Sequence, residues 1–374
     1  MRAIREAGDA SVEFVGVGGD AMEAEGLHSL FSLSEIAVMG ILPVIARLPR
    51  LIARIRQTAR AIVAARPDGL VIIDSPDFTH RVARLVRRSL PRLPVIDYVS
   101  PSVWAWRPGR ARRMRSYVDR VLALLPFEPA VHKALGGPVC DYVGHPLIER
   151  LDELRPDALE AARRGASPPS IVVLPGSRRS EINRLCEDFG AGLALVGKEI
   201  GALEVILPTL PDIEHEIRRL VASWSVAPKI VVTEKEKFAA FRRARAALAA
   251  SGTVTLELAL AGVPMIGAYK VSLIEEQLKY LVKAPSFLLP NLILGERAIP
   301  EILQRECTPE NLASALLAIL RDSPERAAQI QSLRQLDGLM QLPGGEQPSE
   351  RAARLILETI RTGAALPAPA RTTA

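Results

Sequence analysis

Aromatic residues make up only 4% of this 374-residue sequence. Proteins that hold single-stranded nucleic acids commonly stack the bases on aromatic side chains, so the composition argues against a nucleic-acid partner. The three cysteines, Cys140, Cys186 and Cys307, are odd in number and far apart. This spacing indicates structural thiols in a reducing compartment, and it predicts no metal site.

Long hydrophobic runs are also missing. No stretch approaches the roughly 20 apolar residues that span a bilayer, and the first six residues do not have the composition of a signal peptide. We therefore expect a cytoplasmic protein whose contact with a membrane is peripheral. The net charge of +6 suits an anionic partner such as a phosphate, a nucleotide or an acidic lipid.

Short apolar runs alternate with helical patterns along the whole chain, which is typical of α/β proteins with parallel sheets. In the first half, the predicted strands are 12–17, 70–73, 95–99 and 121–125. In the second half, they are 171–174, 203–207, 229–232, 246–249 and 265–268. A polar, proline-rich segment at 155–169 separates the halves. We therefore predict an N-terminal domain over 1–155, a C-terminal domain over 156–362 and a disordered tail over 363–374.

The expected fold is thus two Rossmann-like α/β domains that face each other across a cleft, with the carboxyl ends of both sheets lining it. This arrangement is typical of two-domain glycosyltransferases of the B type. Epimerases and binding proteins also have it, so the fold alone does not determine the function.

A first glycine loop in the second half follows the predicted strand 171–174 and precedes a helix. After Gly176, the residues Ser177 and Arg178 lead into the first helical turn. Backbone amides and the helix dipole favour an anion there, and an arginine can clamp it. An ordinary turn with a surface arginine explains the same pattern equally well.

A second loop repeats this design after the strand 246–249. Ser251, Gly252 and Thr253 can surround a diphosphate with amides and hydroxyls, and Glu257 can accept hydrogen bonds from ribose hydroxyls. The alternative is that Ser251 only caps the helix and Glu257 is solvated. Two such loops in one domain favour a nucleoside diphosphate over either alternative.

Two acids stand at the carboxyl end of the predicted strand 70–73. Asp74 is the candidate general base for an attacking hydroxyl, and Asp77 is the second choice. Aspartates at such positions often only cap turns.

The run at 98–106 contains two tryptophans that suit a sugar pocket or a small core. His145 is a secondary candidate, since an isolated histidine is usually structural.

Apolar residues recur at helical spacing between residues 41 and 56, with Arg47, Arg50 and Arg54 between them. We expect Pro49 to kink or divide this helix. Such a stripe usually packs into a core. A short amphipathic helix rich in arginine also fits an anionic membrane surface, and the three arginines are therefore candidate membrane contacts.

These motifs occur in an order that resembles the lipid-A-disaccharide synthases. The run Ser-Pro-Ser-Val-Trp-Ala-Trp and the run Pro-Asn-Leu are the most specific of them. The matching segments are 16–19, 35–40, 73–78, 98–106, 125–128, 143–146, 174–178, 251–253 and 289–292, which cover nearly the whole chain.

The resemblance implies a metal-independent inverting hexosyltransferase of lipid A biosynthesis without a cofactor. Such an enzyme joins UDP-2,3-diacylglucosamine to the 6-hydroxyl of 2,3-diacylglucosamine 1-phosphate on the inner face of the inner membrane. By this resemblance Asp74 is the base. The UDP site comprises Arg178, Ser251, Gly252, Thr253 and Glu257. Met39 and Asn291 match positions that the family needs for activity.

Two other functions remain open from the sequence. One is another UDP-sugar enzyme of the same fold, either an epimerase or a glycosyltransferase, and the other is an inactive membrane-associated binder. The start of the chain favours the second, because relatives carry an earlier strand and glycine loop that residues 1–11 do not match. We therefore expect the first domain to lack its first strand, with Met1 an internal start and low activity.

Overall fold

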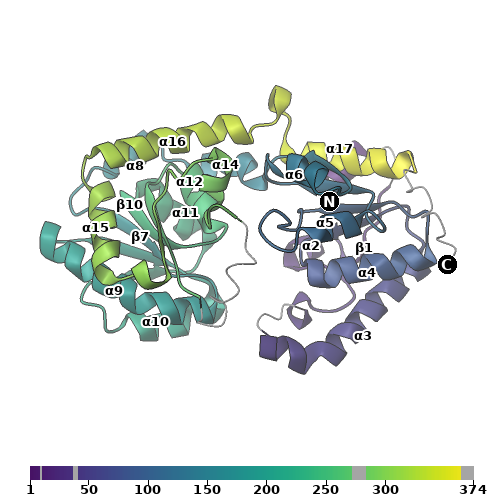
Figure 1. The fold of residues 1–374 in the computed structure, drawn as a ribbon, viewed down its shortest axis with the longest axis horizontal. Helices are drawn as coiled ribbons and strands as arrows, with labels where there is room; N and C mark the ends of the chain where they lie inside the picture. Colours follow the sequence, from purple (N-terminus) through teal and green to yellow (C-terminus); the bar gives the residue numbers. More distant parts are fainter. Residues whose placement is uncertain (9–10, 37–40, 272–283, 364–374) are drawn as a thin grey trace. The chain divides into compact units, whose positions relative to one another are not determined.

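The computed structural model describes residues 1–8, 11–36, 41–271 and 284–363, and the side chains of 41–46 are not part of that description. Two compact units make up the chain (Figure 1). The first comprises Met1–Pro146 and Leu342–Ala374, and the second comprises Leu147–Gln341. Each unit is an α/β body around its own parallel sheet.

The first unit contains a four-stranded parallel sheet in the order β3-β4-β5-β6. Its strands are β3 (Leu70–Ile73), β4 (Val95–Tyr98), β5 (Arg120–Ala123) and β6 (Val139–Tyr142). The first three confirm predicted strands, whereas β6 was not predicted. Of the predicted strand 12–17, only β1 (Val15–Gly16) forms, and it pairs with β2 (His28–Ser29) in a separate two-stranded sheet.

Helices cover both faces of the four-stranded sheet, because alternate residues of each strand point to opposite sides. On one face, α3 (Ile41–Ala65) and α4 (Pro76–Ser89) pack around Val95 and Val121. On the other, α17 (Pro348–Arg361) packs on Ile96 and Leu122. The other helices here are α1 (Arg2–Ala7), α2 (Asp20–Glu23), α5 (Gly109–Met114) and α6 (Glu128–Ala134).

The last helix belongs to a different unit from the one that the sequence suggested. We expected residues through 362 in the C-terminal domain, but the chain returns at Leu342 and α17 completes the core of the first unit. Arg120 of β5 donates to the Thr359 hydroxyl over 3.1 Å. A methyl group on Gly69 would lie 2.5 Å from the Ile360 side chain. An apolar stripe predicts that a helix packs on a sheet, but not on which sheet.

The second unit has a six-stranded parallel sheet in the order β12-β11-β10-β7-β8-β9. Its strands are β7 (Ser170–Leu174), β8 (Glu204–Pro208), β9 (Lys229–Val231), β10 (Ala246–Ala250), β11 (Met265–Tyr269) and β12 (Glu301–Leu303). All five predicted strands are confirmed and β12 is additional. The chain winds outward in both directions from β7 and β10, so the switch point of the sheet lies between these two strands.

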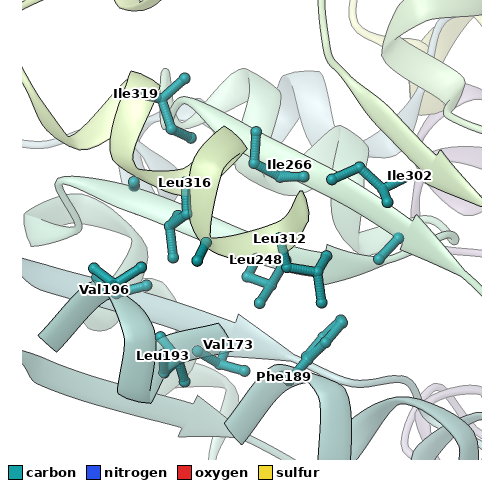
Figure 2. Packing of buried hydrophobic residues seen from close by; sticks show 14 of the residues in the cluster. Val173, Phe189, Leu193, Val196, Leu248, Ile266, Ile302, Leu312, Leu316 and Ile319 are labelled. Carbon is teal, nitrogen blue, oxygen red and sulfur yellow. The ribbon is translucent and has the colours of Figure 1, made fainter. Parts of the chain in front are cut away.

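The core of the second unit lies between this sheet and helices α9 (Arg179–Ile200) and α15 (Pro309–Leu320). Figure 2 shows Phe189 and Leu193 of α9 meeting Val173 and Leu248 of the sheet, with Leu312 of α15 beside them. The remaining helices are α7 (Leu151–Leu154), α8 (Ala158–Arg163), α10 (Glu214–Val221), α11 (Glu234–Arg243), α12 (Val254–Leu260), α14 (Leu289–Leu294) and α16 (Pro324–Met340). Every helix in the described part of the chain is too short or too polar to span a bilayer.

Candidate functional site

The loop after β7 is a tight turn that already contains a carboxylate. Gly176 has a φ of +122°, and a Cβ there would lie 2.7 Å from Glu181, so only glycine fits. Glu181, buried in the first turn of α9, accepts hydrogen bonds from Arg178 Nη1 at 2.8 Å and from the Ser177 amide at 3.3 Å. The sequence predicted Arg178 in this loop but not that Glu181 orients it.

The loop after β10 sits on the other side of the switch point. Gly252, with a φ of +154°, is exposed together with Thr253. The Ser251 hydroxyl donates to the Phe287 carbonyl at 2.5 Å, and Thr253 is the residue that precedes α12. The alternative in which Ser251 merely caps this helix is therefore wrong. The two loops that the sequence indicated thus follow the two neighbouring central strands of one sheet, β7 and β10.

Glu257 lies in α12 and is not simply solvated. Its Oε2 lies 2.7 Å from Nζ of Lys237 on α11, and the two side chains are 15% and 22% exposed. Lys237 also stands over the Phe238 ring, 4.8 Å from its centroid. Sequence reasoning missed Lys237, because its pairing with a residue 20 positions away depends on how α11 and α12 pack.

Asn291 lies in α14 and is 2% exposed. Its amide nitrogen donates to the Ile299 carbonyl and to Glu301, each over 2.9 Å, and its carbonyl oxygen accepts from the Ile299 amide over 2.9 Å. The side chain is thus engaged within the protein. Met39, the other residue implied by the resemblance to matter for activity, lies outside the described residues.

In the first unit, Asp74 and Ser75 follow β3 with left-handed φ values of 48° and 44°. Val99, at the end of the adjacent β4, has a φ of 76°. A β-branched residue rarely adopts a positive φ, and such strained positions cluster at functional sites. Asp74 is exposed, and among the described residues its carboxylate has no hydrogen-bond or ion-pair partner. A carboxylate in this state is available to a ligand.

Asp77 differs from Asp74 in its surroundings. It lies in the first turn of α4 and pairs with Arg110 at 3.1 Å and with Arg107 at 3.9 Å. The Asp77 carboxylate is therefore already engaged by guanidinium groups, unlike that of Asp74. His145 follows β6, and burial lowers its pKa to about 4, so its imidazole is neutral at pH 7.

Buried polar groups lie under the tryptophan-containing segment after β4. Glu128, at the start of α6, accepts from Trp104 Nε1 at 3.2 Å and from the Leu125 amide at 3.0 Å. Burial raises its pKa to about 7. Beside it, Ser100 hydrogen bonds His132 over 2.9 Å, and burial lowers the pKa of His132 to about 4. Sequence reasoning gave Glu128 no role of its own.

A second buried pair lies between β4 and α4. His80 Nε2 stands 3.3 Å from Asp97 Oδ2, and His80 Nδ1 is 3.1 Å from the Tyr117 hydroxyl. Burial raises the pKa of Asp97, and the hydrogen bond to His80 opposes this rise. The pair ties the first turns of α4, which follow Asp74, to the centre of the sheet.

Helix α3 combines core and surface residues. Ile55 packs in the core, whereas Leu48 and Ile52 are 42% and 36% exposed. The helix runs from Ile41 to Ala65 through Pro49, so of the two expected effects, a kink or a division, the division does not occur. The missing amide of a proline leaves one carbonyl unpaired, and tertiary packing of the second half of the helix holds it together.

The three arginines predicted to contact a membrane are not equivalent. Arg50 and Arg54 both bind Glu35, with nitrogen–oxygen distances of 2.8 and 2.7 Å. The Arg54 guanidinium also covers the Phe31 ring at 4.6 Å. Arg47 is exposed on the same helix as Leu48 and Ile52. Intramolecular pairing therefore neutralises part of the positive charge that the sequence assigned to this surface.

No group of three or more histidine, cysteine, aspartate or glutamate side chains that could hold a metal ion occurs among the described residues. Arg178 stands in the loop after β7, and Lys237 pairs with Glu257 of α12, the helix that follows the loop after β10.

Comparisons with known proteins agree with the resemblance found in the sequence. The model of a family described as lipid-A-disaccharide synthetase matches residues 1–353. A lipid-A-disaccharide synthase of Nitrobacter hamburgensis is 55% identical over 361 residues, which is 96% of this chain and 91% of that protein.

Similar solved structures include one that holds UDP-GlcNAc and one that holds UDP. The UDP-GlcNAc 2-epimerase of Neisseria meningitidis, bound to UDP-GlcNAc, has a TM-score of 0.59 with 12% identity, covering 96% of this chain and 97% of that one. The Staphylococcus aureus MnaA–UDP co-structure has a TM-score of 0.63 with 12% identity, covering 96% and 90%. At such identity the likeness shows the fold alone.

Proposed function

Since the chain belongs to the lipid-A-disaccharide synthase family, we propose that it transfers 2,3-diacylglucosamine from UDP to the 6-hydroxyl of 2,3-diacylglucosamine 1-phosphate. The products are the lipid A disaccharide 1-phosphate and UDP. One observation supports this function most directly: the two glycine loops of the second unit follow β7 and β10, at the switch point where α/β sheets bind nucleotides.

The donor's UDP is bound by the second unit. The exposed Gly252 and Thr253 amides approach the diphosphate, and the guanidinium of Arg178, oriented by Glu181, binds a phosphate oxygen. Glu257 accepts from the ribose hydroxyls while Lys237 keeps the carboxylate in place. These groups stabilise the negative charge on the departing UDP, which makes a metal ion unnecessary for the leaving group.

The acceptor is activated by the first unit. Asp74 takes the proton of the 6-hydroxyl, and the oxygen attacks the anomeric carbon as the bond to UDP breaks, with inversion. The free carboxylate of Asp74 suits this role better than the arginine-paired carboxylate of Asp77. The strained backbone at Asp74, Ser75 and Val99 holds the base in a fixed position after β3.

Substrate delivery takes place at a membrane surface. Leu48 and Ile52 of α3 expose apolar area beside Arg47, and an exposed apolar and basic helix face binds anionic bilayers. The acylated substrates reside in such a bilayer. We therefore place the protein peripherally on the inner face of the inner membrane. The scarcity of aromatic residues argues against a nucleic-acid partner.

The test is turnover of the two acylated sugars by the purified chain, with and without EDTA. We expect disaccharide and UDP in equal amounts at the same rate in both conditions. Loss of activity in EDTA that Mg²⁺ restores would refute the metal-free mechanism. Epimerised UDP-sugar without consumption of the acceptor would refute the transfer itself.

The base is tested by Asp74→Asn, with Asp77→Asn as the matched control. We expect Asp74→Asn to lower kcat by about 10²-fold or more and to leave the affinity for UDP unchanged, because UDP binds the other unit. Asp77→Asn should keep most of the activity. The reverse ranking of the two variants would assign the base to Asp77.

A further inference from the structure

A chain of hydrogen bonds runs from β12 to the loop after β10. Glu301, the first residue of β12, accepts from Asn291 Nδ2 at 2.9 Å, from the Ser286 hydroxyl and from the Phe287 amide at 3.0 Å. The Phe287 carbonyl in turn accepts from the Ser251 hydroxyl at 2.5 Å. Residue Phe287 thus connects Glu301 on its amide side to Ser251 on its carbonyl side.

The segment 286–288 is fixed against β11, the strand between β12 and β10. The Phe287 ring stacks on Tyr269 with centroids 6.2 Å apart and planes inclined by 27°. Leu288 packs where Gly267 has no side chain, since a Cβ on Gly267 would lie 2.6 Å from it. The position of the Phe287 carbonyl therefore depends on Glu301 and on close packing over β11.

Asn291 has no amide group left for a ligand. Both bonds donated by its nitrogen and the bond accepted by its oxygen end on Ile299 and Glu301, and the residue is 2% exposed. Any effect of Asn291 on activity must therefore pass through its partners. Of these partners, Glu301 is the one that also holds the segment beside Ser251.

We propose that Glu301 is a positioning residue for the nucleotide-binding loop: it holds segment 286–288 so that the Phe287 carbonyl fixes the Ser251 hydroxyl, and with it Gly252 and Thr253. The proposal rests on the function proposed above, in which this loop binds the diphosphate of UDP. Hydrogen bonds to a carboxylate are stronger than those between neutral groups. A charged residue at this point therefore holds the loop in one arrangement before UDP arrives, which lowers the ordering cost of binding.

The experiment compares Glu301→Gln with Glu296→Gln. Glutamine keeps the size of the side chain. Its NH₂ group replaces one carboxylate oxygen and cannot accept the hydrogen bonds that this oxygen accepts. Glu296 is an exposed glutamate of the same unit whose side chain bonds Ser332 and not this segment. We expect Glu301→Gln to raise the Kd for UDP and the KM for the UDP-sugar about tenfold, the loss of one charged hydrogen bond. The KM for the acceptor, and all constants of Glu296→Gln, should stay unchanged.

Ser286→Ala provides a second variant that keeps the carboxylate. It removes one of the bonds to Glu301 and also the bond that the Leu288 amide donates to the Ser286 hydroxyl. It should raise the Kd for UDP in the same direction by a smaller factor, and it serves if Glu301→Gln does not fold. Combining Glu301→Gln with Ser251→Ala should cost no more than the worse single change, since both break the same connection.

Three results would overturn the inference. The first is an unchanged Kd for UDP in both Glu301→Gln and Ser286→Ala. The second is a Glu301→Gln protein with a lowered unfolding temperature but a normal KM for the UDP-sugar. The third is a Glu301→Gln protein whose KM values for the UDP-sugar and for the acceptor change equally. If the parent chain binds UDP and any of these three results is found, the inference is refuted but the proposed function is not. A parent chain that neither binds UDP nor turns over refutes the proposed function and this inference together.

Discussion

Replacing Glu257 with glutamine is the change that tests how the second unit recognises the ribose. In the free protein Glu257 Oε2 already faces Lys237 at 2.7 Å, with both side chains mostly buried. We expect UDP binding to leave this ion pair in place, so that its own energy largely cancels in a comparison of affinities. The hydrogen bonds from the ribose hydroxyls to the carboxylate do not cancel.

The expected magnitude follows from that difference. A hydrogen bond to a charged group contributes about 1.5–3 kcal/mol, so Glu257→Gln should raise the Kd for UDP by roughly 10- to 100-fold. With 2′,3′-dideoxy-UDP as ligand the same substitution should change the Kd by less than about threefold, because the hydroxyls that it served are gone. The measured quantity is the ratio of two Kd increases caused by Glu257→Gln, the increase for UDP divided by the increase for the dideoxy ligand.

Calorimetry with both ligands on the parent chain, Glu257→Gln and Glu214→Gln completes the cycle. Glu214 is an ion-paired glutamate of the same unit, on α10 with Arg218, and its loss should affect neither ligand. An equal penalty for UDP and for its dideoxy form would refute the ribose assignment. It would indicate that Glu257 only keeps Lys237 and the helix pair α11 and α12 in place.

Two further predictions concern the first unit. The triple variant Arg47→Gln, Leu48→Ser and Ile52→Ser should co-sediment less with anionic vesicles, and the loss should be largest at low salt. A basic residue contributes about 1 kcal/mol to binding at such a surface. Equal binding by the triple variant and its parent would show that α3 faces no membrane. Burial raises the pKa of Glu128 to about 7 from 4.5, so the contribution of Glu128 to the unfolding free energy falls by about 3 kcal/mol as pH rises from about 4.5 to 7. The buried His132 and His145, whose pKa values are lowered to about 4, contribute in the opposite direction in both proteins. The measured quantity is therefore the unfolding free energy of the parent minus that of Glu128→Gln, which should fall by this amount over that pH range, with a change of tryptophan fluorescence through Trp104 in the parent; a difference that does not vary with pH would contradict the prediction.

Much of this fold and site follows from local patterns. The Ala-rich strand β10 with its Ser-Gly-Thr loop and the strand β7 with its Gly176 turn were predicted because strand, glycine and helix start are neighbours in the sequence. The strands β6 and β12 were not predicted, since Asp141 interrupts the apolar run of β6, and β12 has only two consecutive apolar residues, Ile302 and Leu303.

The partners of the site residues are the part that sequence reasoning could not supply. Glu181 beside Arg178 lies within one helical turn, and the spacing i, i+3 was a signal that could have been used. Lys237 beside Glu257 and Glu301 beside Asn291 depend on the packing of separate elements. Hydrophobic periodicity predicts that elements pack, but it does not determine which polar atoms then meet.

The return of α17 to the first unit affects the order in which a newly made chain can fold. The sheet β3–β6 is complete once residue 142 has been made, but Ile96 and Leu122 stay uncovered until the residues of α17 emerge. At a synthesis rate of about 5–20 residues per second this delay is on the order of 10 s or more. The whole second unit, Leu147–Gln341, is synthesised in that interval. The second unit can therefore fold while the first still exposes an apolar sheet face, which makes the nascent first unit the part that needs protection from aggregation.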